Sequence, residues 1–356
     1  MYKIEKDWKL PEKKKIQHSM MKKQIELLAL LLIFTLSGCD SGSNGIIMTV
    51  AGPVPARSAG ITLTHEHILV DFIGADSISS SRWNREEVMN IALPFLMKIK
   101  DRGCMTFIDC TPEYIGRDPE LLRSLSESSG LNIVTNTGYY GAADYKFIPR
   151  HAYSESADQL SERWISEWEN GIAGTGIKPG FIKTAVFGGS LSDLHRKLVT
   201  AAARTHLKTG LVIASHTGPA QPAFEQLEIL RKEGVSPDAF IWVHAQAEQD
   251  PVNHVKAGKI GAWVSFDGLN ENNAASYVKL IRNMKENNLL DRVLLSHDAG
   301  WYDPAKPSGG EFRGYNTLFE TLVPLLKAES FTDSEIRQLL VENPAKAFIV
   351  KVRMIK

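Results

Sequence analysis

Two histidines flank one glutamate at the end of an apolar run in the segment LTHEHILVDF, residues 63–72. In an extended strand, side chains two residues apart point to the same face, so His65 and His67 should project together and Glu66 should point to the other side. Two neutral imidazoles that converge on one point suit a divalent metal ion such as zinc. A hydrogen-bonded pair of histidines at a strand edge would show the same spacing, so a metal site needs further ligands from the rest of the chain.

From residue 46 onward, short β-branched or apolar runs alternate with longer amphipathic segments, which predicts alternating strands and helices. The segment 192–210 has apolar residues at helical spacing and ends in glycine, and TDSE at 332–335 is a helix-capping signal. This alternation predicts an α/β fold of the (β/α)8 TIM-barrel type, with a doubly wound open sheet as the alternative. Strands are expected at residues 61–67, 104–110, 131–137, 180–186, 211–217, 239–245, 261–267 and 292–298.

Residues that can bind a metal ion stand on five of these eight strands, toward their carboxyl ends. That end of a TIM barrel carries the catalytic groups. Core packing does not explain four histidines and one aspartate on the same rim, so the sequence predicts a metal centre there. The candidate ligands are His65, His67, Lys183, His216, His244 and Asp298.

This order of residues resembles the phosphotriesterase family of the amidohydrolase superfamily. Four stretches are similar to that family, and the resemblance extends over residues 46–350: TLTHEHILVD (62–71), FIDCTPEYIGRDPE (107–120), GFIKTAVFG (180–188) and ENPAKAF (342–348). The resemblance implies a binuclear centre at the C-terminal face of the strands. Zinc suits the histidine-rich set best, and manganese, cobalt and iron are the alternatives.

Carried over by position, the resemblance assigns each candidate ligand a place. His65, His67 and Asp298 would bind the more buried ion, and His216 and His244 the more exposed one. Lys183, carboxylated by carbon dioxide, would bridge both ions. Lys183 lies in an apolar strand, where burial favours the neutral amine that can add carbon dioxide. A lysine that extends to a nearby carboxylate is the alternative.

The implied activity is metal-dependent hydrolysis of an ester-like bond in a small molecule. A metal-bridging hydroxide would attack the carbonyl of a lactone or carboxylic ester, and Asp298 would pass the proton to the leaving group. A phosphotriester or other phosphoester is the alternative substrate for the same centre. An alternative of another class is a non-catalytic lipoprotein that binds metal or solute.

The loops that select the substrate depart from better-known members of the family. Gly268 follows the aspartate of the seventh strand, where phosphotriesterases have histidine and the related lactonases have arginine. The loop 299–316 could close over the substrate, or it could be an ordered structural loop. The candidate substrate contacts are Tyr139, Tyr140, Trp301, Tyr302 and Arg313, and packing on the barrel rim is the alternative for the two tyrosines that follow the third strand.

Three polar residues beside the candidate ligands are expected to support them. Glu66 should make a structural hydrogen bond. Asp267 should either orient a metal-ligating histidine or cap a helix. His297 should serve as second-layer support or as packing.

The N-terminal residues predict export and a lipid anchor. Residues 20–38 have a basic start, an apolar run and the ending LSG before Cys39, which resembles a bacterial lipoprotein signal peptide. Cys39 would be the lipidated residue at the start of a tether over residues 39–45. An uncleaved membrane anchor is the alternative, and residues 1–19 are expected to precede the true start. The hydrolase barrel would then occupy residues 46–356, on a lipoprotein of the bacterial cell envelope that faces the periplasm or the exterior.

Composition narrows the classes of partner. Lys plus Arg and Asp plus Glu both number 41, and this balance argues against a nucleic-acid binder. Cys104 and Cys110 are expected to be buried thiols, because two cysteines do not make a disulfide framework. The membrane should be contacted through the lipid anchor alone, and the resemblance adds a homodimer as an expectation.

Overall fold

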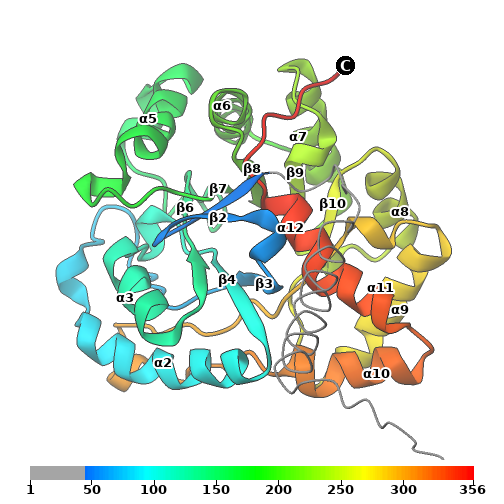
Figure 1. The fold of residues 1–356 in the computed structure, drawn as a ribbon. Helices are drawn as coiled ribbons and strands as arrows, with labels where there is room; N and C mark the ends of the chain where they lie inside the picture. The colour runs from blue at the N-terminus through cyan, green and yellow to red at the C-terminus, as the bar shows by residue number, and fades with distance from the viewer. Residues whose placement is uncertain (1–44) are drawn as a thin grey trace, which may run out of the picture. The chain divides into compact units, whose positions relative to one another are not determined.

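The computed structural model describes residues 45–356, which fold into a barrel of parallel strands surrounded by helices (Figure 1). Each observed strand of the barrel lies inside a predicted segment. The predicted TIM barrel is therefore confirmed, and the open sheet is not formed. The barrel strands are β3 (Ile61–Glu66), β4 (Cys104–Asp109), β5 (Asn132–Val134) with β6 (Asn136–Thr137), β7 (Phe181–Ala185), β8 (Val212–His216), β9 (Phe240–Val243), β10 (Trp263–Phe266) and β11 (Val293–Leu295).

The third strand of the barrel is interrupted. Its first half, β5, pairs with β4, and its second half, β6, pairs with β7. The parallel ladders therefore run β3-β4-β5 and β6-β7-β8-β9-β10-β11. This break lies just before the tyrosine pair 139–140, where the chain leaves the barrel.

The barrel closes between its first and last strands through individual hydrogen bonds. Thr64 Oγ1 donates to Leu295 O over 3.1 Å, and the backbone N–H of His65 donates to Ser296 Oγ over 2.9 Å. The N–H of Asp298 donates to His65 O over 3.0 Å. Closure thus places Asp298 next to His65, although the two residues lie near opposite ends of the barrel sequence.

Helices with sequence-encoded ends cover the outside of the barrel. The predicted helix 192–210 is α6, which begins with a capping box at Ser192 and ends at Gly210 with φ 76°. The TDSE signal forms the capping box of α11 at Thr332 and Glu335. The helices are α2 (Arg85–Asp101), α3 (Pro119–Ser129), α4 (His151–Ser154), α5 (Ala157–Asn170), α6 (Asp193–Thr209), α7 (Ala220–Lys232), α8 (Pro251–Lys259), α9 (Ala274–Glu286), α10 (Val323–Ala328), α11 (Asp333–Arg337) and α12 (Asn343–Phe348).

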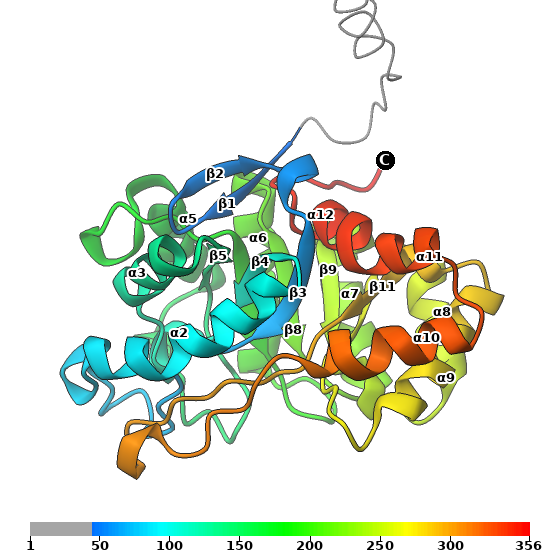
Figure 2. The same ribbon diagram turned by 60° about the horizontal axis from the view of Figure 1, so that its bottom comes forward.

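A short hairpin that the sequence did not predict covers one end of the barrel. Its strands, β1 (Ile46–Thr49) and β2 (Gly52–Pro55), pair antiparallel. Ile47 packs into the interior cluster that contains Phe181 and Phe348. In Figure 2 this hairpin lies at one end of the molecule, and the orange segment after β11 runs along the opposite end. The hairpin thus covers the end where the strands begin, and the carboxyl ends of the strands, at the opposite end, remain available for a functional site.

The predictions about the cysteines and the N-terminal segment have different outcomes. Cys104 and Cys110 are free and buried, as expected. The predicted start, signal peptide, lipidated Cys39 and tether lie outside the described residues, except for residue 45 of the tether. Among the described residues, no helix has the length and apolar character needed to cross a bilayer.

Candidate metal centre

The carboxyl ends of the strands bring six predicted side chains together, which we call the strand-end cluster: His65, His67, Lys183, His216, His244 and Asp298. The ring centroids of His65 and His67 are 5.4 Å apart, and those of His216 and His244 are 4.4 Å apart. The rings of His65 and His244 bridge the two pairs with a centroid separation of 5.0 Å. Residues from five barrel strands thus surround one small volume.

Asp267, which follows β10, holds two of the imidazoles. Its fully buried carboxylate lies 3.1 Å from His65 Nδ1 and 2.7 Å from His244 Nδ1. Ser265 Oγ donates to the same carboxylate over 2.7 Å. Burial opposes ionisation of Asp267, but His244 and His65 outweigh it and hold the pKa of this carboxyl well below its usual range. Of the two roles predicted for Asp267, the contacts support the orientation of histidines.

The other two imidazoles have hydroxyl partners. His67 Nδ1 lies 2.7 Å from Thr111 Oγ1, and His216 Nδ1 lies 3.1 Å from the Tyr140 hydroxyl. All four Nδ1 atoms are therefore occupied by a partner outside the cluster. An imidazole that donates its Nδ1–H, as His65 and His244 do to the Asp267 carboxylate, presents an unprotonated Nε2, which is the common metal-binding form.

Asp298 faces the Nε2 atoms of His65, His67 and His244. Its Oδ1 lies 3.1 Å from His67 Nε2 and 3.7 Å from His65 Nε2, and its Oδ2 lies 4.0 Å from His244 Nε2. His65, His67 and Asp298 offer ligand atoms that all lie within 4.8 Å of one another. This donor set and its supporting hydrogen bonds fit a divalent metal ion.

The protonation of three members of the cluster fits cation binding, whereas the pKa of the fourth, His244, is raised, because Asp267 and Asp298 outweigh its burial. Burial, followed by the positive charge of Lys183, lowers the pKa of His65 to about 4. Burial, followed by the charge of His244, lowers the pKa of His216 well below its ordinary value. Burial alone would favour the protonated form of Asp298, but the neighbouring His65 and His67 hold the pKa of its carboxyl below the usual range. These groups therefore favour the states that bind metal.

Lys183 is enclosed at the floor of the cluster. Its side chain is 1% exposed, and Nζ lies 3.3 Å from His65 Nε2. That nitrogen is its one hydrogen-bond partner among residues 45–356, so no described carboxylate is paired with it. The lysine of the apolar strand thus points at the imidazoles and not toward an ion-pair partner.

The backbone turns sharply where the cluster leaves the strands. His244 has φ 61° and Asp298 has φ 53°, values in the left-handed region that few non-glycine residues adopt. Gly300 has φ 96°, and a Cβ there would lie 1.9 Å from His67 O. Glycine is therefore required for the last loop to pass this close to the first strand.

Glu66 and His297 support the cluster from behind, as the alternation along the first strand predicted. Glu66 Oε1 accepts from Ser296 Oγ over 2.7 Å and lies 2.6 Å from His297 Nδ1. The N–H of Ala299 donates to Glu66 Oε2 over 3.0 Å. His297 Nε2 accepts from the N–H of Leu318. Both side chains thus hold the segment that carries Asp298, and the predicted structural role of Glu66 is confirmed.

The predicted substrate contacts divide into two groups. The Tyr140 hydroxyl contacts His216, the Trp301 ring meets the His67 ring edge-on at 5.9 Å, and the Arg313 guanidinium lies 4.8 Å from the Trp301 ring. Arg313 also donates to the carbonyl oxygen of Asp298. In the part of the chain that the structure describes, no contact joins Tyr139 or Tyr302 to the strand-end cluster.

The position after Asp267 is enclosed by two residues that the sequence did not single out. The N–H of Gly268 donates to the Tyr277 hydroxyl over 2.7 Å. A Cβ on Gly268 would lie 2.8 Å from Gln246 Nε2 and 3.2 Å from that hydroxyl. A histidine or arginine at this position would therefore require the Gln246 side chain to move. Thr111, also missed, could have been found as a polar residue just beyond the end of the second strand.

The comparisons with known proteins agree with this geometry. The model of the phosphotriesterase family matches residues 45–348. The phosphotriesterase homology protein of Escherichia coli (strain K12) is 30% identical over 293 residues, which are 81% of this chain and 98% of the relative. A crystal structure of the Escherichia coli phosphotriesterase homology protein, complexed with phosphate in its active site, matches with a TM-score of 0.71 and 28% identity. That match covers 82% of this chain and 99% of the solved one.

Two further relatives differ in the activity that their names give. An aryldialkylphosphatase of Saccharolobus solfataricus is 26% identical over 310 residues, covering 83% of this chain and 96% of the relative. An N-acetyltaurine hydrolase of Xenopus tropicalis is 23% identical over 346 residues, covering 85% and 98%. A family match over most of the chain, and a relative at 30% identity that is covered almost completely, establish membership: the chain belongs to the phosphotriesterase family.

Proposed function

We propose that this hydrolase uses two divalent metal ions, held by the strand-end cluster, to open a lactone or cleave a carboxylic ester. The observation that carries the proposal is the convergence of four imidazoles, each with Nδ1 held by a partner outside the cluster, beside Asp298 and Lys183. Zinc is the preferred metal for this histidine-rich set, and manganese, cobalt and iron are the alternatives. The complete set of candidate ligands favours catalysis over the non-catalytic lipoprotein that binds metal or solute, and the rate assay below separates the two.

The residues have separate tasks in this proposal. His65, His67 and Asp298 would hold one ion, and His216 and His244 the other. The ions would supply an activated water molecule and a Lewis acid for the carbonyl oxygen. Asp298, whose carboxylate is held ionised at the mouth of the cluster, can accept a proton at Oδ2 and deliver it to the leaving alkoxide. Trp301 and Arg313 stand at the edge of the cluster, where the remainder of a substrate would lie.

Lys183 is proposed as the bridging ligand after carboxylation by carbon dioxide. Its burial beside His65, with no carboxylate of residues 45–356 paired to it, supports a lysine that reacts with carbon dioxide to form a carbamate. Native mass spectrometry of the metal-loaded protein should show a carbamate-dependent mass increment that Lys183→Ala lacks, together with metal loss in the variant. Equal metal content in the variant and the parent would contradict the assignment.

A phosphoester is the second candidate substrate. The solved relative with phosphate in its active site and the aryldialkylphosphatase favour it, and the N-acetyltaurine hydrolase adds an amide carbonyl to the classes worth testing. Gly268 does not separate the two candidates, because it replaces both the histidine of phosphotriesterases and the arginine of the related lactonases; the carbonyl ester is our first candidate and the rate assay decides between them.

The deciding experiment is a paired rate assay on zinc- and manganese-loaded protein. Aliphatic lactones, an aryl dialkyl phosphate and an N-acetyl amide are compared, with Asp298→Asn as the control. We expect the lactones to have the highest kcat/KM and to depend on Asp298. A faster phosphate reaction would replace the carbonyl ester with the phosphoester, and no Asp298-dependent turnover of any compound would contradict the proposed mechanism.

Residues 20–45 support a location on the bacterial envelope, with Cys39 lipidated and the barrel facing the periplasm or exterior. Membrane fractionation tests this location, because Cys39→Ser should release the protein into the soluble fraction while ester hydrolysis is kept. Unchanged membrane association of the variant would point to the uncleaved anchor. A homodimer is proposed from resemblance alone, and light scattering of the purified protein tests it.

A further inference from the structure

The C-terminal tail, residues 349–356, crosses the end of the barrel where the strands begin. In Figure 2 the C-terminus and the β1–β2 hairpin lie at the same end of the molecule. Backbone hydrogen bonds join the tail to β1 and to the segments just before β8 and β9: Val350 N–H to Ile46 O at 2.8 Å, Lys351 N–H to Gly210 O at 2.9 Å and Ile355 N–H to Gly234 O at 3.0 Å. The tail and the start of the hairpin therefore form one surface, at the end opposite the strand-end cluster.

One side chain of the last six residues points inward, and the others are exposed. The inward side chain is Arg353, which is 6% exposed and donates to three carbonyl oxygens at the end of α12. This anchor holds large apolar side chains in the solvent on both sides of it, and Met354 is 62% exposed. We call the exposed set the tail surface: Ile46, Lys351, Val352, Met354, Ile355 and Lys356. Adjacent exposed apolar side chains with a polar rim are typical of a surface that contacts a partner or a membrane.

The tail surface also carries positive charge. Lys351 and Lys356 flank its apolar side chains, and Lys208 is exposed nearby, in the last turn of α6. None of these three lysines has an ion-pair partner among residues 45–356. The carboxylates that adjoin the tail are already paired, in the ion pairs Glu233–Arg204 and Asp238–Arg353. Free lysines beside apolar side chains suit a segment that lies on an anionic bilayer.

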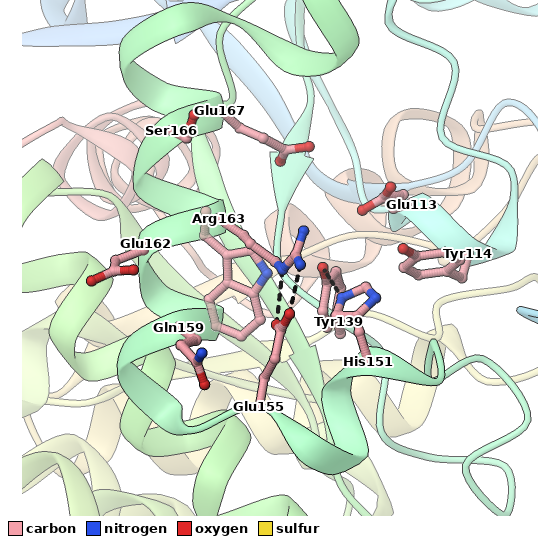
Figure 3. A pocket seen from close by; sticks show the side chains of 11 residues that line it. Glu113, Tyr114, Tyr139, His151, Glu155, Gln159, Glu162, Arg163, Ser166 and Glu167 are labelled. Carbon is pink, nitrogen blue, oxygen red and sulfur yellow. Dashed lines mark hydrogen bonds and ion pairs between the residues drawn. The ribbon is translucent and has the colours of Figure 1, made fainter.

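Part of the opposite end carries the other sign of charge. Figure 3 shows a cavity beside the loops that follow β4 and β6, and four glutamates line it: Glu113, Glu155, Glu162 and Glu167. Two guanidinium groups face these four carboxylates, because Arg163 pairs with Glu155 and Arg117 pairs with Glu167. An anionic surface would therefore repel this end of the barrel and attract the tail surface.

The length of the tether adds an independent constraint, which rests on the proposed lipidation of Cys39. Five residues, 40–44, lie between Cys39 and Gly45, the first residue that the structure describes. A fully extended chain of this length spans about 20 Å at most. Gly45 directly precedes β1, so a lipid on Cys39 would keep the hairpin end within about this distance of the lipid headgroups.

We propose that the tail surface rests on an anionic phospholipid bilayer, so that the strand-end cluster opens away from the membrane. Its apolar side chains would enter the headgroup region, and its lysines would lie beside lipid phosphates. The lipid would hold the protein on the bilayer, and the tail surface would add a second contact that fixes the orientation. A second copy of the chain is the other occupant for such a surface, and the short tether favours the bilayer.

A fluorescent label tests the orientation on lipidated, metal-loaded protein in vesicles of phosphatidylcholine and phosphatidylglycerol. An environment-sensitive dye is attached in Met354→Cys, because Cys104 and Cys110 are buried and Cys39 would be acylated. Val252→Cys is the matched control, since Val252 is an apolar residue that is 65% exposed at the start of α8, toward the other end of the barrel. We expect a blue-shifted emission at position 354, relative to the same label on Cys39→Ser protein in solution, and no shift at position 252.

The lipid anchor and the orientation fail in different ways. A mass spectrum without lipid on Cys39 would overturn the proposed location and this inference with it. A lipidated protein whose label at position 354 stays in water, or whose two labels shift equally, would overturn the orientation alone.

The charge contribution is measured by sedimentation of the unanchored Cys39→Ser protein with phosphatidylglycerol vesicles at low ionic strength. Lys351→Gln and Lys356→Gln should each lower the partition coefficient about fivefold, as expected for one basic residue at an anionic surface. Lys146→Gln is the matched control, because Lys146 is an exposed lysine in the loop after β6. Unchanged partition in both tail variants, or an equal loss in the control, would contradict the proposal.

Light scattering separates the bilayer from a second copy of the chain. Met354→Asp should leave the oligomeric state of the protein unchanged, because the tail surface is expected to contact lipid. A dimer that dissociates in this variant would assign the surface to a second copy and overturn the proposal.

Discussion

The candidate metal centre has two regions that are held in different ways. The floor is the strand-end cluster with the residues that hold its imidazoles, and the rim is the 299–316 loop with Trp301 and Arg313. On the floor, buried partners occupy one nitrogen of every imidazole, and Asp267 alone holds His65 and His244. On the rim, the 299–316 loop is fixed mainly through its backbone, as in the paired N–H···O bonds between Gly300 and Arg313 at 3.0 and 2.9 Å. Side chains on the floor are thus directed by hydrogen bonds to their rings, whereas Trp301 and Arg313 on the rim are held by packing on each other and on His67, and by the Arg313 bond to the Asp298 carbonyl. The difference suggests that the floor determines the chemistry and the rim determines the substrate.

The largest effect is expected at Asp298. Asp298→Asn should lower kcat about 10³-fold, because it removes both the proton acceptor and an anionic ligand. Steady-state kinetics together with metal analysis of the purified variant test this expectation. A loss of less than about tenfold with full metal content would show that the floor does not depend on this carboxylate.

A smaller effect is expected at Asp267, which holds two of the candidate metal ligands without being one of them. An asparagine has one acceptor oxygen, so in Asp267→Asn its amide NH2 would face the Nδ1–H of either His65 or His244. Metal affinity should fall about 10- to 100-fold, the usual result of losing a carboxylate behind a ligating histidine. Competition with a chelator measures the change. If excess metal restores full kcat, the role of Asp267 is to position the imidazoles and not to act in the reaction.

Tyr140 tests the hydroxyl-held part of the floor. Tyr140→Phe keeps the ring beside His216 but removes its hydrogen-bond partner, so we expect about a three- to tenfold loss in metal affinity or kcat. The neighbouring Tyr139→Phe is the matched control, because its hydroxyl contacts His151 instead. Equal losses in the two variants would remove the distinction between the two sides of this segment.

The smallest effects are expected on the rim. Trp301→Phe and Arg313→Met should change KM about two- to fivefold, in a way that depends on the substrate, because each removes contact surface without removing a cluster residue. Metal content should stay at the level of the parent. Metal loss in either variant would break the comparison, since the rim would then be supporting the floor through the Arg313 contact with the Asp298 carbonyl.

Much of the floor could be predicted because it depends on local rules. The two-residue period of a strand places His65 and His67 on one side and Glu66 on the other, whatever the rest of the chain does. A capping box predicts where α6 and α11 begin for the same reason. Parallel strands in a barrel present their carboxyl ends on one rim, so residues far apart in sequence could be assigned to one site before any distance was known.

The rest depends on contacts between distant segments. Whether Asp267 capped a helix or held histidines could not be decided from its neighbours, because both roles follow the same strand end. The direction of Tyr139 and the partners around Gly268 depend on how loops pack against α5 and α9. The N-terminal hairpin was missed because its short strands are stabilised by the barrel end that they cover.

The sequence by itself determined the order of strands, the family and the set of candidate ligands, since these rest on residue type and period. Only the tertiary structure decided which atoms face each other. It turned the Nε2 atoms of His65, His67 and His244 toward Asp298 and directed Lys183 to His65. The physical reason is that hydrogen-bond direction and burial are set by the packing of segments from the whole barrel, which no local pattern contains.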